Sequence, residues 1–455
     1  MSPAPPAAGR TTRRATAART ARPVADPGHF GGPLAPLHGL LDRPLASYYL
    51  LLSSAGLLLI IGLVMVFSAT SVRALREYGS AYVPIAHQAT YAVVGLVAFW
   101  ICQRLPASTY RSLGKPLLLV SVALLLLLDV LTLLQSRKVI SSAALGPLVA
   151  DDLWLHLGPI QLQPSELAKF ALVLWGAHVL ARKGRAIGWW RELRPLFVVA
   201  IVVFALVGYG DLGTMLILLI LFVGLLWAAG VRLQVFAGMV GVALAGVALL
   251  VLVKRSYRLE RLTAFINPGD CDPLKECWQA LQGLRAIARG GWFGVGLGEG
   301  SAKWGWLPAE DNDFIYAVIG EELGVVGCLL VLTLFAVLTY TGLRIARRVD
   351  DPFRRLAAAA VTAWIVGQAT INIGGVVGLL PITGLPLPFI SDGGSALVVV
   401  LAAVGMLASF ARAEPDAARA LHARSPARWV RLIWAPLPPL PAGRSGRTVN
   451  GRRRT

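Results

Sequence analysis

Five carboxylates stand close together in GWLPAEDNDFIYAVIGEELG, residues 305–324, in a chain with only 24 acidic residues among 455. Asp313 directly precedes an apolar segment, and a carboxylate positioned there can act as a general base that removes a proton from an attacking hydroxyl. A structural role is the alternative, because the helix dipole stabilises a carboxylate in the first turn of a helix. Glu321 and Glu322 lie roughly 80° and 180° around a helix from Asp313, so both cannot face the same cavity.

Further ionisable residues stand within apolar segments, where they tend to face the interior of a helix bundle. Glu166 and Lys169 are three residues apart, share one helix face and can form an ion pair. That pair either lines a site or only orders its helix. Glu166, Asp211, Asp313 and Asp392 all fall near the same ends of their segments, which predicts one site built from four parts of the chain.

The composition indicates an integral membrane protein. Hydrophobic residues make up 56% of the chain, charged residues 15%, and the mean hydropathy is +0.66. Apolar segments of about 20 residues recur, each long enough for a helix to cross the hydrocarbon layer. We therefore predict an all-α, polytopic bundle of about ten transmembrane helices. The spans are expected near 48–70, 84–103, 116–134, 164–181, 195–209, 211–229, 234–253, 313–340, 357–380 and 393–411.

The net charge of +19 follows membrane topology and not a nucleic-acid-binding pattern. Alternate loops are rich in Lys and Arg, which places both termini in the cytoplasm and makes the chain a multi-pass cell-membrane protein. Residues 1–47 and 412–455 are predicted to be basic, disordered cytoplasmic tails, and no cleavable signal peptide is visible. Residues 425–435 either belong to that disorder or lie on the lipid surface through their aromatic and basic side chains.

A long loop, residues 254–312, is expected outside the cytoplasm. Its positive charge, which includes Lys303, calls for an anionic partner, and its glycines favour tight turns over a dinucleotide site. Cys271 and Cys277 share this loop, where a disulfide can persist; two free thiols are the alternative.

Several segments together resemble the SEDS family (shape, elongation, division and sporulation), which includes the FtsW and RodA proteins. They cover the chain from the first span to the last in the family's order. The matching segments are GLVMVFSAT (62–70), LGPIQLQPSELAKF (157–170), DLGTMLIL (211–218), YRLERLTAFINP (257–268), GLGEGSAKWGWLPAEDNDFIYAVIGEELG (296–324) and NIGGVVGLLPITGLPLPFISDGGSAL (372–397).

The resemblance implies a ten-span membrane domain at 48–411 and a peptidoglycan glycosyltransferase that polymerises lipid II at the outer face of the membrane. The tails and the 296–328 region resemble actinobacterial FtsW, the division type, which implies a place at the septum. Asp313 matches the family's essential acidic residue. Glu166, Lys169 and Asp211 match cavity-lining positions, and Ser391 and Ser395 lie in its last motif, where Asp392 replaces a common Tyr.

The implied reaction joins lipid II to a glycan carried on polyprenyl pyrophosphate. Asp313 is the candidate general base, and the charge on the leaving pyrophosphate needs Lys and Arg or a divalent cation, Mg²⁺ or Mn²⁺. Arg258, Arg261, Lys303 and Lys169 are the candidates for that contact. Expected partners are membrane lipids, a class B penicillin-binding protein and divisome proteins. The alternatives are a flippase for the lipid-linked precursor and a scaffold without catalysis.

Overall fold

The computed structural model describes residues 39, 41–137, 144–145, 148–151, 153–158, 160–184, 190–241 and 277–440. The chain divides into two compact units, Met1–Arg43 and Pro44–Thr455. The first unit is described only at residues 39 and 41–43, so the following account concerns the second.

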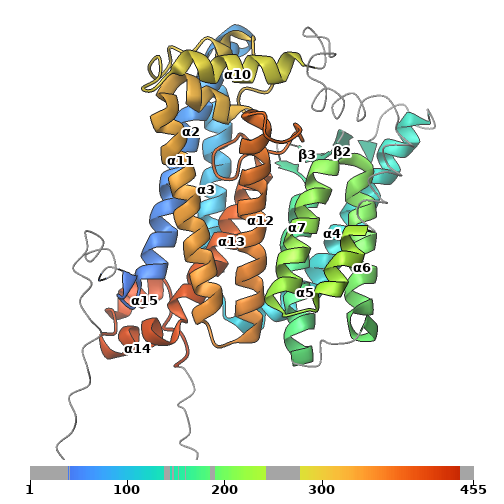
Figure 1. Ribbon diagram of the computed structural model, residues 1–455, viewed down its shortest axis with the longest axis vertical. Coiled ribbons are helices and arrows are strands. Elements are labelled where there is room, and N and C mark those ends of the chain that lie inside the picture. The colour runs from blue at the N-terminus through green and yellow to red at the C-terminus, as the bar shows by residue number, and fades with distance from the viewer. Residues whose placement is uncertain are drawn as a thin grey trace, which may run out of the picture. The chain divides into compact units, whose positions relative to one another are not determined.

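The second unit is a bundle of long helices (Figure 1). The long helices are α2 (Ala46–Tyr78), α3 (Val83–Cys102), α4 (Ala107–Ser136), α5 (Pro164–Lys183), α6 (Trp190–Gly210), α7 (Leu212–Ala228), α11 (Ile315–Arg348), α12 (Pro352–Val376) and α13 (Ser395–Arg412). The shorter ones are α10 (Trp278–Gly290), the 3-10 helix η2 (Ala302–Trp304), α14 (Pro415–Ala423) and α15 (Arg428–Ile433).

Hydropathy and length support a membrane bundle. Seven of the described helices are long and apolar enough to cross a bilayer, α7 is apolar but shorter, and α5 carries the Glu166–Lys169 pair. Nine of the ten predicted spans correspond to helices α2–α7 and α11–α13. The predicted span at 234–253 is helical over residues 233–241, and the rest of it lies outside the described residues.

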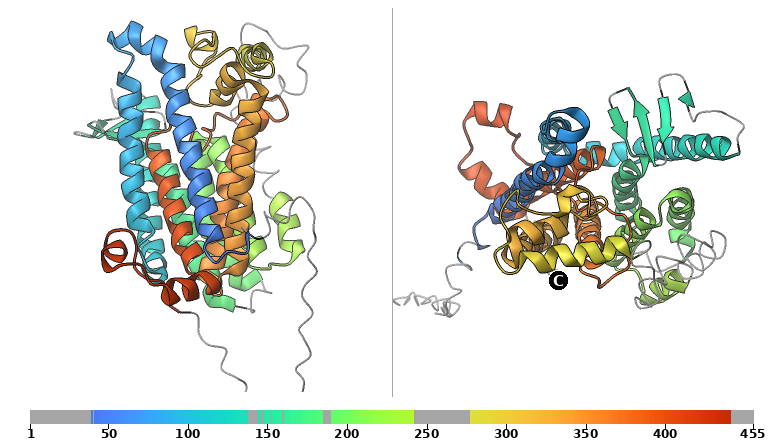
Figure 2. Two further views of the ribbon diagram at one scale, coloured as in Figure 1. Left: turned by 90° about the vertical axis from the view of Figure 1, so that its left-hand side faces the viewer. Right: turned by 90° about the horizontal axis from the view of Figure 1, so that it is seen from above.

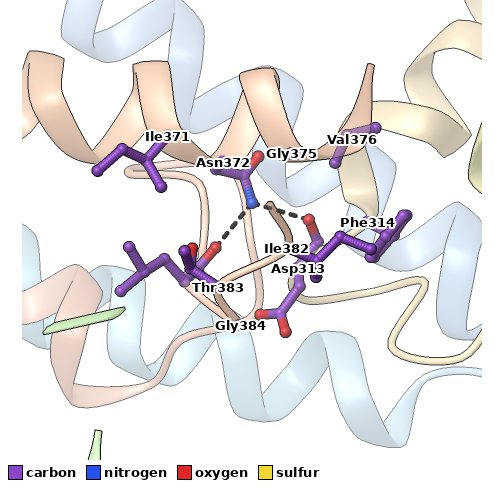
Figure 3. A pocket seen from close by; sticks show the side chains of 10 residues that line it. Asp313, Phe314, Ile371, Asn372, Gly375, Val376, Ile382, Thr383 and Gly384 are labelled. Carbon is purple, nitrogen blue, oxygen red and sulfur yellow. Dashed lines mark hydrogen bonds between the residues drawn. The ribbon is translucent and has the colours of Figure 1, made fainter. Parts of the chain in front are cut away.

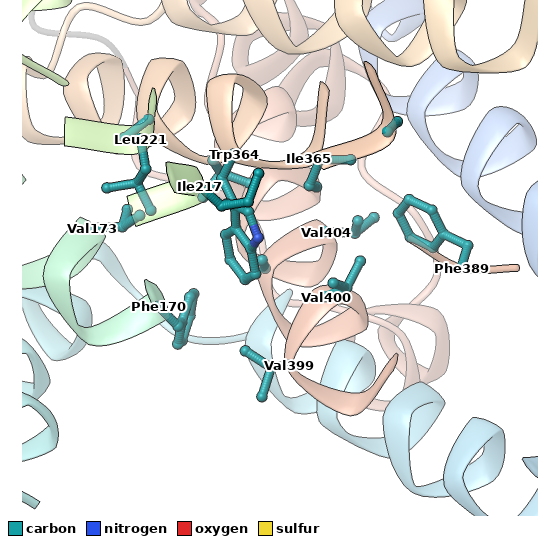
Figure 4. Close-up of a cluster of buried hydrophobic side chains, with 14 of the residues drawn as sticks. Phe170, Val173, Ile217, Leu221, Trp364, Ile365, Phe389, Val399, Val400 and Val404 are labelled. Atoms are coloured by element: carbon teal, nitrogen blue, oxygen red, sulfur yellow. The ribbon is translucent and has the colours of Figure 1, made fainter. Parts of the chain in front are cut away.

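Helices α12 and α13 form the centre of the bundle. The most apolar windows of α12 and α13 are 72% and 89% buried, against 22% for α3 and 28% for α4, which present apolar side chains outward as lipid-facing helices do. Trp364 of α12 is fully buried and lies among Phe170 of α5, Ile217 of α7 and Val400 of α13 (Figure 4). This packing fixes the helices from which the polar residues project.

A small antiparallel sheet connects α4 to α5, and it was not predicted from the sequence. Its strands β1 (Ala144–Leu145), β2 (Leu148–Asp151), β3 (Trp154–Leu157) and β4 (Ile160–Leu162) follow one another in order. Strands of two to four residues are too short to show an alternating pattern. The sheet leads directly into the first turn of α5.

Helix α11 is broken at Gly324, where the backbone has φ +68° and ψ −166°. The loop after α10 enters the break. Val295 and Gly296 donate backbone hydrogen bonds to Glu321 O and Glu322 O, and Val325 and Val326 donate to Gly291 O and Trp292 O. A β-carbon on Gly294 would lie 2.1 Å from Glu322 O, so only glycine allows this approach. The glycines for which tight turns were predicted therefore lie where this loop packs against the break in α11.

The start of the C-terminal tail is ordered, contrary to the prediction of disorder after residue 412. Helices α14 and α15 project from the end of the bundle beside α2 and α3 (Figures 1 and 2). Trp100 of α3 donates to Ile433 O of α15, and Arg412 of α13 donates to Ala435 O and Pro436 O just after α15. Composition alone could not show these long-range contacts.

Candidate active site

The loop that carries Asp313 is held by three successive carbonyl groups. The backbone N–H of Asp392 donates to Asp311 O at 2.9 Å, Ser391 Oγ donates to Asn312 O at 2.6 Å, and Asn372 Nδ2 donates to Asp313 O at 2.7 Å. Asn372 belongs to α12, and Ser391 and Asp392 precede α13. The three donors therefore fix the position of Asp313 from the centre of the bundle.

The acidic side chains before Asp313 are held separately. Arg73, near the end of α2, forms ion pairs with Asp311 and, at 3.4 Å, with Glu310. Burial raises the pKa of the Glu310 carboxyl. Two of the five clustered carboxylates are therefore paired with Arg73 of α2, which gives them a structural role.

Asp313 lines a small pocket between α12 and residues 381–388, here called the 381–388 loop (Figure 3). A β-carbon on Gly384 would lie 3.6 Å from Asp313 Oδ2, an ordinary contact distance, so this residue of the loop lies directly beside the carboxylate. Its φ of +73° favours glycine at this position. The lining residues are Asp313, Phe314, Ile371, Asn372, Gly375, Val376, Ile382, Thr383, Gly384 and Leu385.

The 381–388 loop connects the other predicted residues to this pocket. Asn372 Nδ2 also donates to Leu385 O at 2.7 Å, and Gln368 Nε2 donates to Pro386 O at 2.9 Å. The same Gln368 accepts a hydrogen bond from Lys169. On another side of the loop, a β-carbon on Gly213 would lie 2.7 Å from Thr383 O, so the start of α7 packs directly on it.

Glu166 and Lys169 form a buried pair. Lys169 Nζ lies 2.7 Å from Glu166 Oε1 and 3.0 Å from Gln368 Oε1, and 5.0 Å from the centre of the Trp364 ring. Glu166 is 1% exposed and Lys169 is 0% exposed. Two acceptors and a ring face surround the ammonium group, so Lys169 faces the bundle interior instead of the pocket. This arrangement supports the structural alternative for the pair, and its contact with a pyrophosphate stays a prediction.

Asp211 caps the helix that follows it. Its carboxylate accepts from Thr214 N at 3.0 Å and from Thr214 Oγ1 at 2.5 Å, which satisfies the first turn of α7. Because Gly213 packs on the 381–388 loop, the cap also fixes α7 against that loop. Asp211 thus lies at the loop, but it does not line the pocket beside Asp313.

The two serines act through backbone groups in the structure. Ser391 Oγ bridges Asn312 O and the N–H of Leu387, so it joins the Asp313 loop to the 381–388 loop. Ser395 Oγ, at the start of α13, accepts from Gln163 N at 3.0 Å just before α5. Contact of these two hydroxyl groups with the substrate stays a prediction.

The remaining basic candidates are not brought to the pocket by the described contacts. Lys303 is 7% exposed and donates to Gly298 O within its own loop. Arg258 and Arg261 lie outside the described residues. Cys277 is one half of a disulfide, whereas Cys271 lies outside the described residues, so their pairing stays a prediction. Cys102 and Cys328 are free thiols.

Glu321 and Glu322 both have buried structural partners. Glu321 accepts from Ser301 N and Oγ and from Ala302 N, and Glu322 accepts from Ser68 Oγ of α2. Both are 1% exposed. Neither lines the pocket, in line with the prediction that they cannot share one cavity with Asp313.

Asp392 lies beside the Asp313 loop. Its pKa is raised to about 6, mainly by burial and also by the nearby Asp311 carboxylate, while His87 and Arg73 act in the opposite direction. Among the residues that the structure describes, no group of three or more His, Cys, Asp and Glu side chains is placed to hold a metal ion. The divalent cation stays a prediction, and we assign no residue of the described part of the chain to it.

Sequence reasoning missed Asn372, Arg73 and the 381–388 loop. Asn372 had a detectable signal, because an amide within an apolar helix usually bonds to another element. Arg73 had none, since its partner Asp311 is 238 residues away. The 381–388 loop lies in the matched segment 372–397, but only the structure shows that its Gly384 lies beside Asp313.

Comparisons with known proteins identify close relatives. A family model described as a cell cycle protein, covering FtsW, RodA and SpoVE, matches residues 48–415. The chain is 42% identical over 400 residues to the probable peptidoglycan glycosyltransferase FtsW of Mycobacterium tuberculosis, covering 88% of this chain and 74% of that protein. It is 35% identical to stage V sporulation protein E of Bacillus subtilis, covering 78% and 94%.

Solved structures show the same fold. A chain from a study of the coordination of polymerisation and crosslinking by a peptidoglycan synthase complex matches with a TM-score of 0.63 and 25% identity, covering 80% of this chain and 96% of that one. The rod shape determining protein RodA of Thermus thermophilus matches with a TM-score of 0.56 and 24% identity, covering 80% and 96%.

Proposed function

The chain belongs to the SEDS family of cell cycle proteins, which includes FtsW, RodA and stage V sporulation protein E, and from this premise we propose that it is a peptidoglycan glycosyltransferase of the division type. The proposed substrates are lipid II and a glycan strand on polyprenyl pyrophosphate. The identity with the mycobacterial FtsW supports the division branch.

Asp313 is proposed as the general base. The observation that carries this role is the placement of its carboxylate in the pocket beside Gly384, while three hydrogen bonds hold the backbone of its loop. A fixed carboxylate at a pocket can remove the proton from an acceptor hydroxyl as it attacks the anomeric carbon, an effect typically worth about 10²–10⁴ in rate.

A direct displacement with inversion needs no second, nucleophilic carboxylate, by analogy with inverting glycosidases. This matches a pocket in which Asp313 is the acidic member of the lining. Pyrophosphate is a good leaving group, so the remaining requirement is positive charge near it. Arg258, Arg261 and Lys303 are proposed for that contact, with Lys169 able to reach it only after its buried pair opens.

The proposed setting is the cytoplasmic membrane, with both termini in the cytoplasm and the pocket near the outer face, at the division septum. The positive charge of alternate loops supports the orientation. A class B penicillin-binding protein is the proposed partner, supported by the related chain in a synthase complex that couples polymerisation to crosslinking. Other divisome proteins are proposed on the family resemblance alone.

The test is polymerisation of purified lipid II by the reconstituted chain with its penicillin-binding protein partner. We expect Asp313→Asn to abolish glycan synthesis while Asp416→Asn, an exposed carboxylate at the other end of the bundle, leaves it unchanged. Lipid II supplied only on the outer face separates the enzyme from a flippase, because only a transferase builds polymer there. Near wild-type polymer from Asp313→Asn contradicts the proposed base.

A further inference from the structure

The C-terminal arm, residues 424–436, lies far from Asp313 and is attached to the bundle through its backbone. Trp100 Nε1 donates to Ile433 O at 2.7 Å, Arg104 Nη1 donates to Leu432 O at 2.6 Å, and Gln103 Nε2 donates to Trp434 O at 3.4 Å. The indole of Trp434 donates to Tyr48 of α2. The arm is therefore held in place, which excludes the simple disordered tail.

Attachment through the backbone leaves the apolar side chains of the arm uncovered. Trp429 is 66% exposed, Leu432 74% and Ile433 58%. Arg424 and Arg428 are exposed on the same short stretch. Such apolar and basic side chains together are typical of an element that lies in the membrane interface and meets anionic headgroups.

The position of the arm agrees with that environment. Gln103 and Arg104 directly follow the last residue of α3, Cys102, so the groups that hold the arm stand where a membrane-spanning helix ends. Figure 2 shows α14 and α15 projecting sideways from that end of the bundle, beside α3. Because α3 is long and apolar enough to cross a bilayer, the membrane interface is expected at the level of its end.

We propose that the C-terminal arm is a membrane-surface anchor, in which Trp429, Leu432 and Ile433 enter the lipid interface and Arg424 and Arg428 bind anionic lipid headgroups. This site is independent of the chemistry at Asp313. In this proposal the exposed apolar side chains of the arm contact a bilayer and not a soluble protein.

Hydrogen exchange by mass spectrometry on the full chain tests the proposal, in nanodiscs of phosphatidylcholine alone and of equal parts phosphatidylcholine and phosphatidylglycerol. We expect amides of the arm to exchange roughly tenfold more slowly with phosphatidylglycerol, since each basic residue near an anionic surface strengthens attachment several-fold. Arg424→Gln with Arg428→Gln removes most of that difference. Arg347→Gln, at an exposed arginine in the last turn of α11, is the control and retains it.

A second variant separates the apolar part of the anchor. Leu432→Gln is expected to speed exchange of the arm in both kinds of nanodisc, because it removes apolar contact with any bilayer. Equal exchange of the wild-type arm in the two nanodiscs overturns the proposal. That result is expected if the arm binds a soluble protein instead of lipid. An equal loss in Arg347→Gln also overturns it, because the effect is then one of net charge.

Discussion

Asp313, the proposed base, and the Glu166–Lys169 pair differ in what surrounds their charged groups. Both stand at the ends of apolar segments, and both connect to the 381–388 loop. Asp313 has a firmly held backbone and a carboxylate at a pocket. Glu166 and Lys169 are fully buried and bond to each other. Exposure to a cavity, and not mere charge in a membrane segment, marks the catalytic candidate.

The largest expected effect comes from replacing the carboxylate of Asp313. Asp313→Asn is expected to lower polymerisation by about 10²–10⁴, because the amide cannot accept the proton. Its thermal unfolding temperature in detergent is expected to stay close to that of the wild type, since the hydrogen bonds to this loop involve backbone carbonyls that the variant keeps. A large drop in that temperature instead makes Asp313 a structural residue.

The next effect concerns the buried pair. Lys169→Met leaves Glu166 buried and unpaired, and is expected to cost about 3–5 kcal/mol in the free energy of unfolding, measured by thermal or denaturant unfolding in detergent. A double variant, Glu166→Leu with Lys169→Met, is expected to recover most of that loss, because apolar residues often replace a buried ion pair without penalty. If a stable double variant still polymerises lipid II, the pair is structural. If the stable double variant is inactive, Lys169 contacts the substrate.

A smaller effect is expected from the clamp between the two loops. Asn372→Ala removes the donor from two carbonyl groups, Asp313 O and Leu385 O, and is expected to cost about 1–3 kcal/mol in stability and to lower polymerisation. Thr362→Ala is the control on the same helix, because the hydroxyl of Thr362 donates to Ala358 O within α12 and not to the Asp313 loop or the 381–388 loop as described. Equal activity of the two variants shows that the clamp does not position Asp313.

The smallest effect concerns pH. The folded pKa of Asp392, about 6, lies above its ordinary 3.8, mainly through burial. The protonated form therefore favours folding: this contribution is complete below about pH 3.8 and is lost as the pH rises through 6. Asp392→Asn stays neutral, so we expect it to stabilise the chain by about 1–2 kcal/mol at pH 7 and by little at pH 4.

Unfolding measured at both pH values checks this prediction, with Asp416→Asn as an exposed control. A constant difference between Asp392→Asn and the wild type across the range contradicts it.

The sequence was sufficient for the bundle and drew attention to Asp313, because hydropathy and costly charges are local signals. It did not show that Asn372 lines the same pocket or that Glu166, Lys169 and Asp211 do not. The four-residue strands of the sheet left no periodicity, and the break in α11 is invisible to hydropathy, since residues 325–337 continue the apolar segment without interruption. Lys169 illustrates a further limit: its type and spacing suit an anion site, and only Gln368 and Trp364, about 200 residues away, show that it is enclosed.

The junction at Gly324 has a consequence for mutational scanning. Four main-chain hydrogen bonds join the loop to the two halves of α11, and alanine carries the same N–H and C=O as the residue it replaces. Alanine variants at Val295 or Val326 therefore preserve the join and report it as dispensable, whereas proline, which lacks the N–H, removes a bond. The bonds that hold this helix together are made by main-chain atoms, so an alanine scan detects the junction only at glycines such as Gly294 and Gly324, where a β-carbon would clash.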